Sequence, residues 1–179
     1  MIGDILDVFK LDIGKLKLKQ IDVNVEKLVN QIVTEFKPLS DEHKVELNSD
    51  IRTSGTVKCD PQRINQVFSA LIKNSLDFVP KEGGRITIRA EDDDTERGHK
   101  VMFTVEDNGI GIPADKMDNL FKKFYQIDTS LIRKHGGTGL GLSICKGIIE
   151  AHNGSIWLDK SYSRGASFKF TLPRNGGTV

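Results

Sequence analysis

Four glycines lie within six residues in the segment Gly136-Gly137-Thr138-Gly139-Leu140-Gly141, which runs directly into a stretch with helical periodicity. Glycines before a helix leave several backbone N–H groups free to face an anion, and the helix dipole adds to the attraction. The segment lacks the GxxxxGK[ST] pattern of the P-loop. No strand leads directly into it and no suitable acidic residue follows, so it also matches the dinucleotide-binding fingerprint poorly. The fold must therefore place an anion-binding loop of another kind at a helix N-terminus, with a plain hinge as the alternative.

The composition is that of a globular domain, because 37% of the 179 residues are hydrophobic and 28% are charged. Lys and Arg number 26 against 25 Asp and Glu, so the net charge of +1 gives no basic surface for nucleic acid. No apolar run approaches the roughly 20 residues of a membrane span, and a secretory signal is absent. Cys59 and Cys145 have no metal-like spacing, which predicts reduced thiols in a cytoplasmic chain, with a disulfide as the alternative.

Apolar residues recur at steps of three and four in several segments, which predicts amphipathic helices. Asp60 is a good N-cap and the proline after it suits the first helical position, whereas Pro38 is expected to end the helix before it. The expected helices are residues 1–19, 25–37, 61–78 and 140–151.

Short alternating segments bounded by turn residues predict strands. They are residues 45–47, 56–59, 85–90, 101–105, 155–158 and 167–172, with a charged hairpin loop over residues 91–100. This order of elements predicts an α+β fold, a two-layer α/β sandwich in which one mixed sheet is covered by helices on one face.

The segment Asp107-Asn108-Gly109-Ile110-Gly111-Ile112 follows the strand expected over residues 101–105. An aspartate just past a strand can present its carboxylate to an exocyclic amine such as that of adenine. The glycines allow the backbone to approach a flat ring closely. An ordinary turn is the alternative interpretation.

Asn74 lies at the edge of the apolar stripe of the helix over residues 61–78, with Ala70 and Asp77 on the same flank. A neutral amide oxygen in that place can hold a hard cation such as Mg²⁺, which prefers oxygen ligands and bridges phosphates. A solvated side chain is the alternative.

Together these segments resemble the ATP-binding superfamily of gyrase, heat-shock chaperones, mismatch-repair ATPases and sensor histidine kinases. They are most similar to the catalytic ATP-binding domain of a sensor histidine kinase, and the likeness covers the chain from about Ile21 onward. The N-box resembles residues 66–78, the G1 box 107–111, the F-box 121–125, the G2 box 137–141 and the terminal strand 165–173. Residues 21–179 are therefore expected to form that catalytic domain.

The resemblance implies that Asp107 holds the adenine amine and that Asn74, the expected catalytic residue, coordinates Mg²⁺. Residues 113–138, which include the stretch between the F-box and the G2 box, would form an ATP lid pinned by Phe121, Phe124 and Tyr125. The other ATP-binding residues that it implies are Gly109, Gly111, Ile112, Tyr125, Arg133, Lys134, Gly137, Thr138, Gly139, Leu140, Gly141 and Leu142. A solvated basic run is the alternative for Arg133, Lys134 and His135.

Residues 1–20 resemble the end of the second helix of the dimerisation and phosphoacceptor domain of these kinases. None of the four histidines heads a His-[Glu/Asp]-x-x-[Thr/Asn]-Pro motif, and His152 is expected to be structural. The acceptor histidine is therefore expected on a dimerisation domain absent from this chain, with a response regulator as an indirect partner. The expected location is the cytoplasm, which includes the cytoplasmic part of a membrane-bound sensor.

Three residues depart from patterns found in the superfamily. Asp77 and Gln126 stand where many of the kinases carry basic residues, and Ala70 stands where the hydrolysing branches carry a glutamate that activates water. The alanine favours phosphoryl transfer from Mg-ATP to a histidine over hydrolysis. A regulatory nucleotide-binding module without kinase activity and a related kinase acting on serine are the alternatives.

Overall fold

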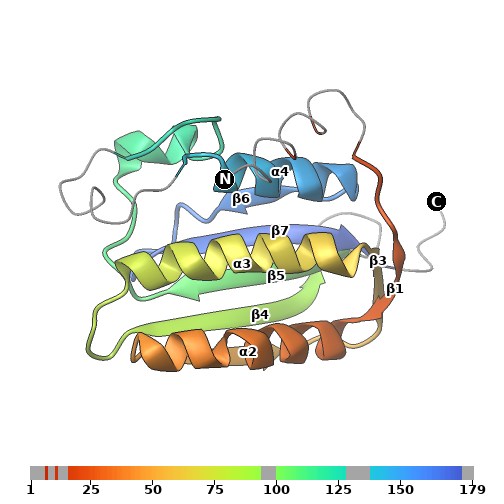
Figure 1. The fold of residues 1–179 in the computed structure, drawn as a ribbon, viewed down its shortest axis with the longest axis horizontal. Coiled ribbons are helices and arrows are strands. Elements are labelled where there is room, and N and C mark those ends of the chain that lie inside the picture. The colour runs from red at the N-terminus through yellow and green to blue at the C-terminus, as the bar shows by residue number, and fades with distance from the viewer. Residues whose placement is uncertain (1–6, 8–10, 12–15, 94–99, 128–137, 175–179) are drawn as a thin grey trace.

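The computed structural model of the chain describes residues 7, 11, 16–93, 100–127 and 138–174. Three long helices lie side by side over a sheet (Figure 1). In chain order the elements are β1 (Ile21–Asn24), α2 (Val25–Glu42), β2 (Glu46–Ile51), β3 (Thr56–Cys59), α3 (Pro61–Phe78), β4 (Arg85–Asp93), β5 (Lys100–Asp107), the 3-10 helix η1 (Ala114–Asn119), α4 (Gly141–Ala151), β6 (Ile156–Leu158) and β7 (Ser167–Pro173).

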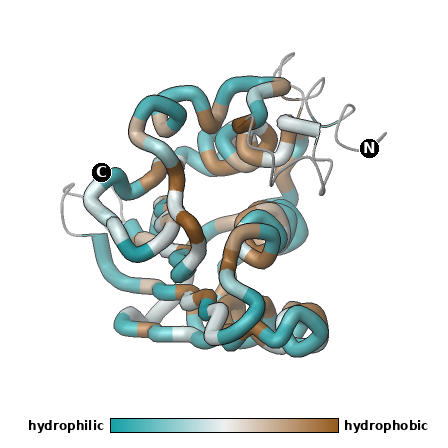
Figure 2. Tube along the Cα trace, turned by 90° about the vertical axis from the view of Figure 1, so that its left-hand side faces the viewer, coloured by the Kyte–Doolittle hydropathy of each residue, from teal (hydrophilic) through white to brown (hydrophobic). Residues whose placement is uncertain are grey.

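The main sheet has five strands in the order β2-β4-β5-β7-β6, and the helices α2, α3 and α4 cover one of its faces (Figure 1). β2 pairs with β4 in parallel, and the other pairings are antiparallel. Hydrophobic and hydrophilic residues alternate along the elements in the side view of Figure 2, as elements with one buried face require. The predicted α+β sandwich with a mixed sheet is confirmed. Among the described residues, no helix is both long and apolar enough for a membrane span.

An aromatic cluster from three elements lies at the centre of the core. Phe68 of α3 packs edge-on against Phe103 of β5 and Phe170 of β7, with ring centroids 5.9 and 5.2 Å away. The two strand residues stack on each other at 5.2 Å, and all three side chains are fully buried. The cluster holds α3 over the middle of the sheet, and the C-terminal half of that helix carries the N-box.

The first strand, β1, was not predicted. It pairs antiparallel with β3 in a separate two-stranded sheet, with Val23 opposite Val57. Only four residues long and followed at once by a helix, β1 gives no alternating pattern that distinguishes it from a linker.

The prediction that Pro38 ends its helix is wrong, because α2 runs through it to Glu42. A proline removes one backbone hydrogen bond, but the turn after it buries Ser40 and stays on the core face. The helix ends where Lys44 turns into the left-handed region, with φ of 57°, and the N–H of Val45 donates to the carbonyl of Ser40.

The helix expected over residues 1–19 is shorter than predicted, since residues 16–20 are irregular. Asp7 and Leu11 are the described residues before them, and both are helical. The Asp7 carboxylate accepts from Arg63 Nη1 at 2.8 Å, and a Cβ on Gly147 of α4 would lie 2.6 Å from Leu11 Cδ1. This segment therefore packs on α3 and α4.

The two cysteines are free, as predicted, and both are buried. Burial raises the pKa of Cys59 and of Cys145 to about 12, so both thiols remain protonated and weakly reactive near neutral pH.

His152 joins the end of α4 to the start of α3, which confirms its structural role. The N–H of Asp60 donates to His152 Nε2 at 3.0 Å, so Nδ1 carries the proton and donates to the carbonyl of Ile148 at 2.7 Å. The side chain is 1% exposed, and burial lowers the pKa of His152 below its ordinary value.

The free energy of unfolding is expected to decrease as the pH falls below the ordinary histidine pKa of about 6.5. In that range the unfolded state binds a proton at His152 that the folded state does not bind. The slope of the free energy of unfolding against pH therefore approaches about 1.4 kcal/mol per pH unit. Urea titrations at several pH values measure the slope. His152→Gln is expected to flatten it, whereas the exposed His43→Gln is a control that keeps it. An unchanged slope in His152→Gln would contradict the assignment.

Candidate functional site

A cavity of about 740 Å³ lies beside the C-terminal half of α3 and the end of β5. Its size is within the range of about 300–1,000 Å³ typical of small-molecule sites. The lining residues are Ala70, Asn74, Asp77, Phe78, Asp107, Ile110, Gly111, Ile112, Pro113, Met117, Leu120, Tyr125, Gln126, Ile127, Thr138, Gly139, Gly141, Leu142, Lys160, Tyr162, Ser163, Gly165, Ala166 and Phe168.

The Asp107 carboxylate lies at this cavity with only 4% of the residue exposed. Its Oδ1 accepts from the N–H groups of Gly109 at 2.9 Å and Ala166 at 3.1 Å. Its Oδ2 accepts from Ser75 Oγ at 2.8 Å. A carboxylate has about four acceptor positions, so Oδ2 can accept one further hydrogen bond from a donor in the cavity. This arrangement suits an exocyclic amine.

Backbone packs tightly around Asp107, which explains part of the glycine pattern. Gly109 does not line the cavity, and a Cβ there would lie 2.7 Å from the carbonyl oxygen of Phe78. A Cβ on Gly165 would lie 2.0 Å from the carbonyl oxygen of Asp107. Gly109 therefore contributes to the site by supporting the carboxylate, whereas Gly111 and Ile112 line the cavity.

One flank of α3 faces the cavity, as the helical periodicity predicts. Asn74 and Ala70 are half-buried and Asp77 is exposed, and all three line the cavity. Among the described residues, no three His, Cys, Asp or Glu side chains form a cluster suited to a metal ion. A cation held by the amide oxygen of Asn74 would need further oxygen ligands from phosphate and water, which is how Mg²⁺ is often bound.

The F-box aromatics do not act alike. The Phe121 ring packs edge-on against Phe168 of β7 with centroids 6.3 Å apart, and Tyr125 lines the cavity. Phe124 is 72% exposed, so its expected role in pinning the segment is wrong. Its backbone has φ of 60° and its N–H donates to the carbonyl of Gly139, which directs the side chain outward.

The glycine-rich segment meets α4 at the cavity. Thr138, Gly139, Gly141 and Leu142 line it, whereas the Leu140 side chain is buried in the core and does not. No side-chain cap is found at the start of α4 within the described chain, so the N–H groups of its first turn remain available to an anion. Arg133, Lys134, His135 and Gly137 lie outside the described residues.

The loop between β6 and β7 was not expected at the site. It contributes Lys160, Tyr162 and Gly165 to the cavity, and Lys160 Nζ lies 2.5 Å from Asp118 Oδ1 of η1. The resemblance of the terminal strand from Gly165 onward was the one signal that pointed to this region.

The geometry of the site agrees with the similarity of the chain to known proteins. Residues 59–176 match the family described as histidine kinase-, DNA gyrase B- and HSP90-like ATPase. The chain belongs to this family. The matched segment contains every residue that lines the cavity.

Two curated relatives show the extent of the similarity. The circadian input-output histidine kinase CikA of Synechococcus elongatus is 31% identical over 97% of this chain and 23% of its own length. Sensor histidine kinase WalK of Bacillus subtilis is 32% identical over 97% of this chain and 28% of its own length. Both relatives are histidine kinases, which confirms the resemblance predicted from the sequence. The chain spans about a quarter of their length.

Solved structures of the ATPase family have the same fold. The catalytic domain of histidine kinase ThkA superposes with a TM-score of 0.73 at 29% identity, over 87% of this chain and 96% of that one. Full-length ShkA in complex with AMPPNP gives a TM-score of 0.82 at 26% identity, over 99% of this chain and 35% of that one.

Proposed function

We propose that the chain binds Mg-ATP in the cavity beside Asp107 and transfers the γ-phosphoryl group to a histidine on a dimerisation domain absent from this chain, within two-component signalling. The observation that carries the proposal is the buried Asp107 carboxylate, which keeps one acceptor position open toward a cavity of about 740 Å³. ShkA, whose structure was solved in complex with AMPPNP, supports nucleotide binding by a protein of this fold.

The lining of the cavity offers separate groups for the base and for the phosphates of ATP. Asp107 would accept from the adenine amine, with Gly111 and Ile112 beside the base. The uncapped start of α4, with Gly139 and Gly141, offers backbone N–H groups for the phosphates. The other proposed nucleotide contacts are Arg133, Lys134, Thr138, Leu142 and Tyr125. Gly109 and Leu140 would act through their backbone, and Gly137 through the glycine-rich loop that it shares with Gly139.

Asn74 would hold Mg²⁺ at the phosphates, where the ion neutralises their charge. Phosphoryl transfer depends mainly on positioning and charge, so the site needs no protein nucleophile. Ala70 offers a methyl group to the cavity at the place where a base for water would stand, and this favours transfer over hydrolysis.

The alternative is a regulatory module that binds nucleotide without transferring phosphate. Asp77 and Gln126 favour it, because both line the cavity and neither adds positive charge near the phosphates. We nevertheless propose that residues 21–179 are the catalytic domain. Residues 1–20 would be the end of a dimerisation helix, and a response regulator would receive the phosphate from the histidine.

Asn74→Ala is expected to weaken ATP binding at least about tenfold in Mg²⁺ and little in EDTA, because the substitution removes only the metal ligand. Isothermal titration in the two buffers measures the difference. Asn65→Ala is the matched control, since Asn65 lies on α3 but bonds to Glu35 of α2. Equal losses in both buffers would show that Asn74 does not bind the metal.

Transfer is tested by mixing the chain with γ-labelled Mg-ATP and a separately prepared dimerisation domain that carries its histidine. The proposal predicts acid-labile, alkali-stable label on that domain, and none when its histidine is replaced by alanine. ATP binding without such label would favour the regulatory module, and an acid-stable phosphoester would indicate a serine kinase.

A further inference from the structure

The loop between β6 and β7, residues 159–166, holds the Asp107 backbone. We propose that Tyr162 of this loop is a positioning residue that sets the preference of the site for adenine, an inference that rests on the proposed function. Tyr162 would act through Asp107, by fixing the backbone from which the carboxylate reaches the base.

The loop is fixed at its base by Asp159. The Asp159 carboxylate accepts from Lys169 Nζ at 2.8 Å and from the backbone N–H and hydroxyl of Ser161 at 3.0 and 2.6 Å. The bonds from Lys169 and Ser161 lower the pKa of Asp159 to about 2, so the carboxylate stays charged at neutral pH. These contacts fix the start of the loop, from which Tyr162 follows.

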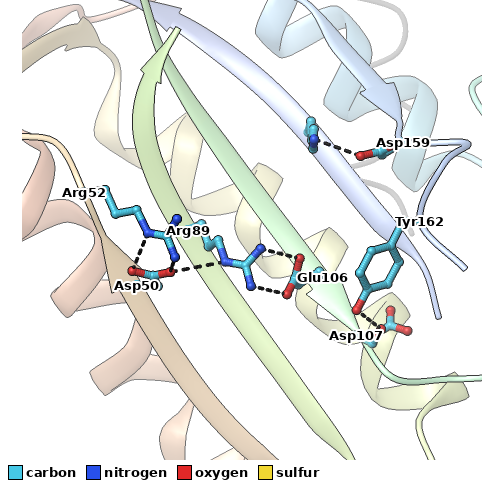
Figure 3. Close-up of polar contacts among 8 residues, drawn as sticks. Asp50, Arg52, Arg89, Glu106, Asp107, Asp159 and Tyr162 are labelled. Carbon is cyan, nitrogen blue, oxygen red and sulfur yellow. Dashed lines mark hydrogen bonds and ion pairs between the residues drawn. The ribbon is translucent and has the colours of Figure 1, made fainter. Parts of the chain in front are cut away.

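Tyr162 reaches from this base to the nucleotide-binding aspartate. Its N–H donates to the Asp159 carbonyl at 3.3 Å, and its hydroxyl donates to the Asp107 carbonyl at 3.2 Å (Figure 3). The Arg164 guanidinium lies 5.6 Å from the centre of the Tyr162 ring, at cation–π distance. The ring is thus held on one side while the hydroxyl holds the peptide group of Asp107.

The same loop contacts Asp107 at three other places. The N–H of Asp107 donates to the Ala166 carbonyl at 2.9 Å, and the N–H of Ala166 donates to Asp107 Oδ1 at 3.1 Å. Gly165 passes so close that a Cβ there would lie 2.0 Å from the Asp107 carbonyl oxygen. Among all four contacts of the loop with Asp107, only the hydrogen bond from Tyr162 is donated by a side chain. A substitution can therefore remove it while the backbone contacts remain.

The surroundings keep Tyr162 in the donor form. Burial, followed by the nearby Glu106 carboxylate, raises the pKa of Tyr162, so its hydroxyl retains the proton at neutral pH. Glu106 is itself fixed by a bidentate ion pair with Arg89, at 2.7 and 2.9 Å (Figure 3). Arg89 Nε also lies 3.3 Å from Asp50 Oδ2. Glu106, the carboxylate near Tyr162, therefore belongs to a row of paired charges with Arg89 and Asp50 on the open face of the sheet.

Position matters because adenine and guanine differ in what they offer to Asp107. Adenine presents an amine, which donates to a carboxylate oxygen, whereas guanine and hypoxanthine present a carbonyl oxygen at the same ring position and repel it. A small displacement of the carboxylate lengthens the favourable bond. Tyr162 should therefore affect binding of a base that presents an amine at this ring position, and leave binding of a base that presents a carbonyl there unchanged.

The test is Tyr162→Phe, which removes the hydroxyl and keeps the ring, with affinities measured by isothermal titration. The dissociation constants for ATP and ADP are expected to rise about threefold to tenfold, in the range of one hydrogen bond. That for inosine triphosphate is expected to stay the same. In an Asp107→Asn background, Tyr162→Phe is expected to cause no further loss of ATP affinity, because its effect passes through the carboxylate.

Unchanged ATP affinity, equal loss for ATP and inosine triphosphate, or additive losses in the double variant would each overturn the inference. Circular dichroism and thermal unfolding confirm that Tyr162→Phe is folded before the titrations are compared. Failure of the proposed function would look different, since the unmodified chain would then show no preference for ATP over GTP.

Discussion

Asp107→Asn is expected to raise the dissociation constant for ATP by about 10- to 100-fold, the range for a hydrogen bond to a charged group. The amide keeps the shape of the carboxylate. If its oxygen accepts from the N–H groups of Gly109 and Ala166, its NH₂ replaces Oδ2 and faces the adenine amine donor to donor. The same NH₂ can donate to the carbonyl oxygen of guanine, so the preference for ATP over GTP should fall with the affinity for ATP.

Asp50→Asn is the matched control for this variant. Asp50 is also a paired carboxylate, but it lies on the open face of the sheet beside Arg52 and Arg89 (Figure 3). The same chemical change there is expected to leave ATP affinity within error. Fluorescence titration with ATP and GTP measures both variants, and unchanged ATP affinity in Asp107→Asn would remove Asp107 from the adenine site.

Gly165→Ala is expected to lower the free energy of unfolding by about 2–5 kcal/mol and to abolish measurable ATP binding. The new Cβ would lie 2.0 Å from the carbonyl oxygen of Asp107 and 2.9 Å from its Oδ1. Both oxygens are held in place, the carbonyl oxygen by the backbone and Oδ1 by two hydrogen bonds, so the loop or the aspartate must move. The φ of +155° adds strain of about 1–3 kcal/mol for any residue with a Cβ.

Gly83→Ala is the control that separates backbone strain from the steric clash. Gly83 also has a positive φ, +71°, but a Cβ there meets no atom within 4 Å. The Gly83→Ala substitution is expected to lower the free energy of unfolding by about 1 kcal/mol, which is the strain of a left-handed backbone alone. ATP binding should be unaffected, since Gly83 does not line the cavity. Urea unfolding measures both losses, and a Gly165→Ala loss no greater than that of Gly83→Ala would contradict the close approach.

The parts of the fold that sequence predicts correctly have local causes. Asp60 and the proline after it mark the start of α3, and the N-cap side chain accepts from the backbone N–H groups of Gln62 and Arg63. Apolar residues at every second position predict β4, β5 and β7, and in the structure these apolar residues are fully buried. The positions of Asn74 and Asp107 follow from these elements, one on the flank of a helix and one at the end of a strand.

The parts that were missed depend on contacts between distant segments. Tyr162 and Ala166 meet Asp107 across 55 and 59 residues, and only the pairing of β5 with β7 brings them together. No local pattern encodes that register. The helix also continues through Pro38, because burial of the following turn against the core outweighs one lost hydrogen bond.

Adenine is expected to bind at Asp107 with the phosphates toward α4. A crystal structure of the chain with Mg²⁺ and AMPPNP tests this most directly. In that structure the adenine amine is expected at about 2.7–3.2 Å from Asp107 Oδ2, the metal on the Asn74 amide oxygen, and phosphate oxygens at the first turn of α4. A nucleotide bound outside this cavity, or a base turned with no donor toward Asp107, would contradict the account.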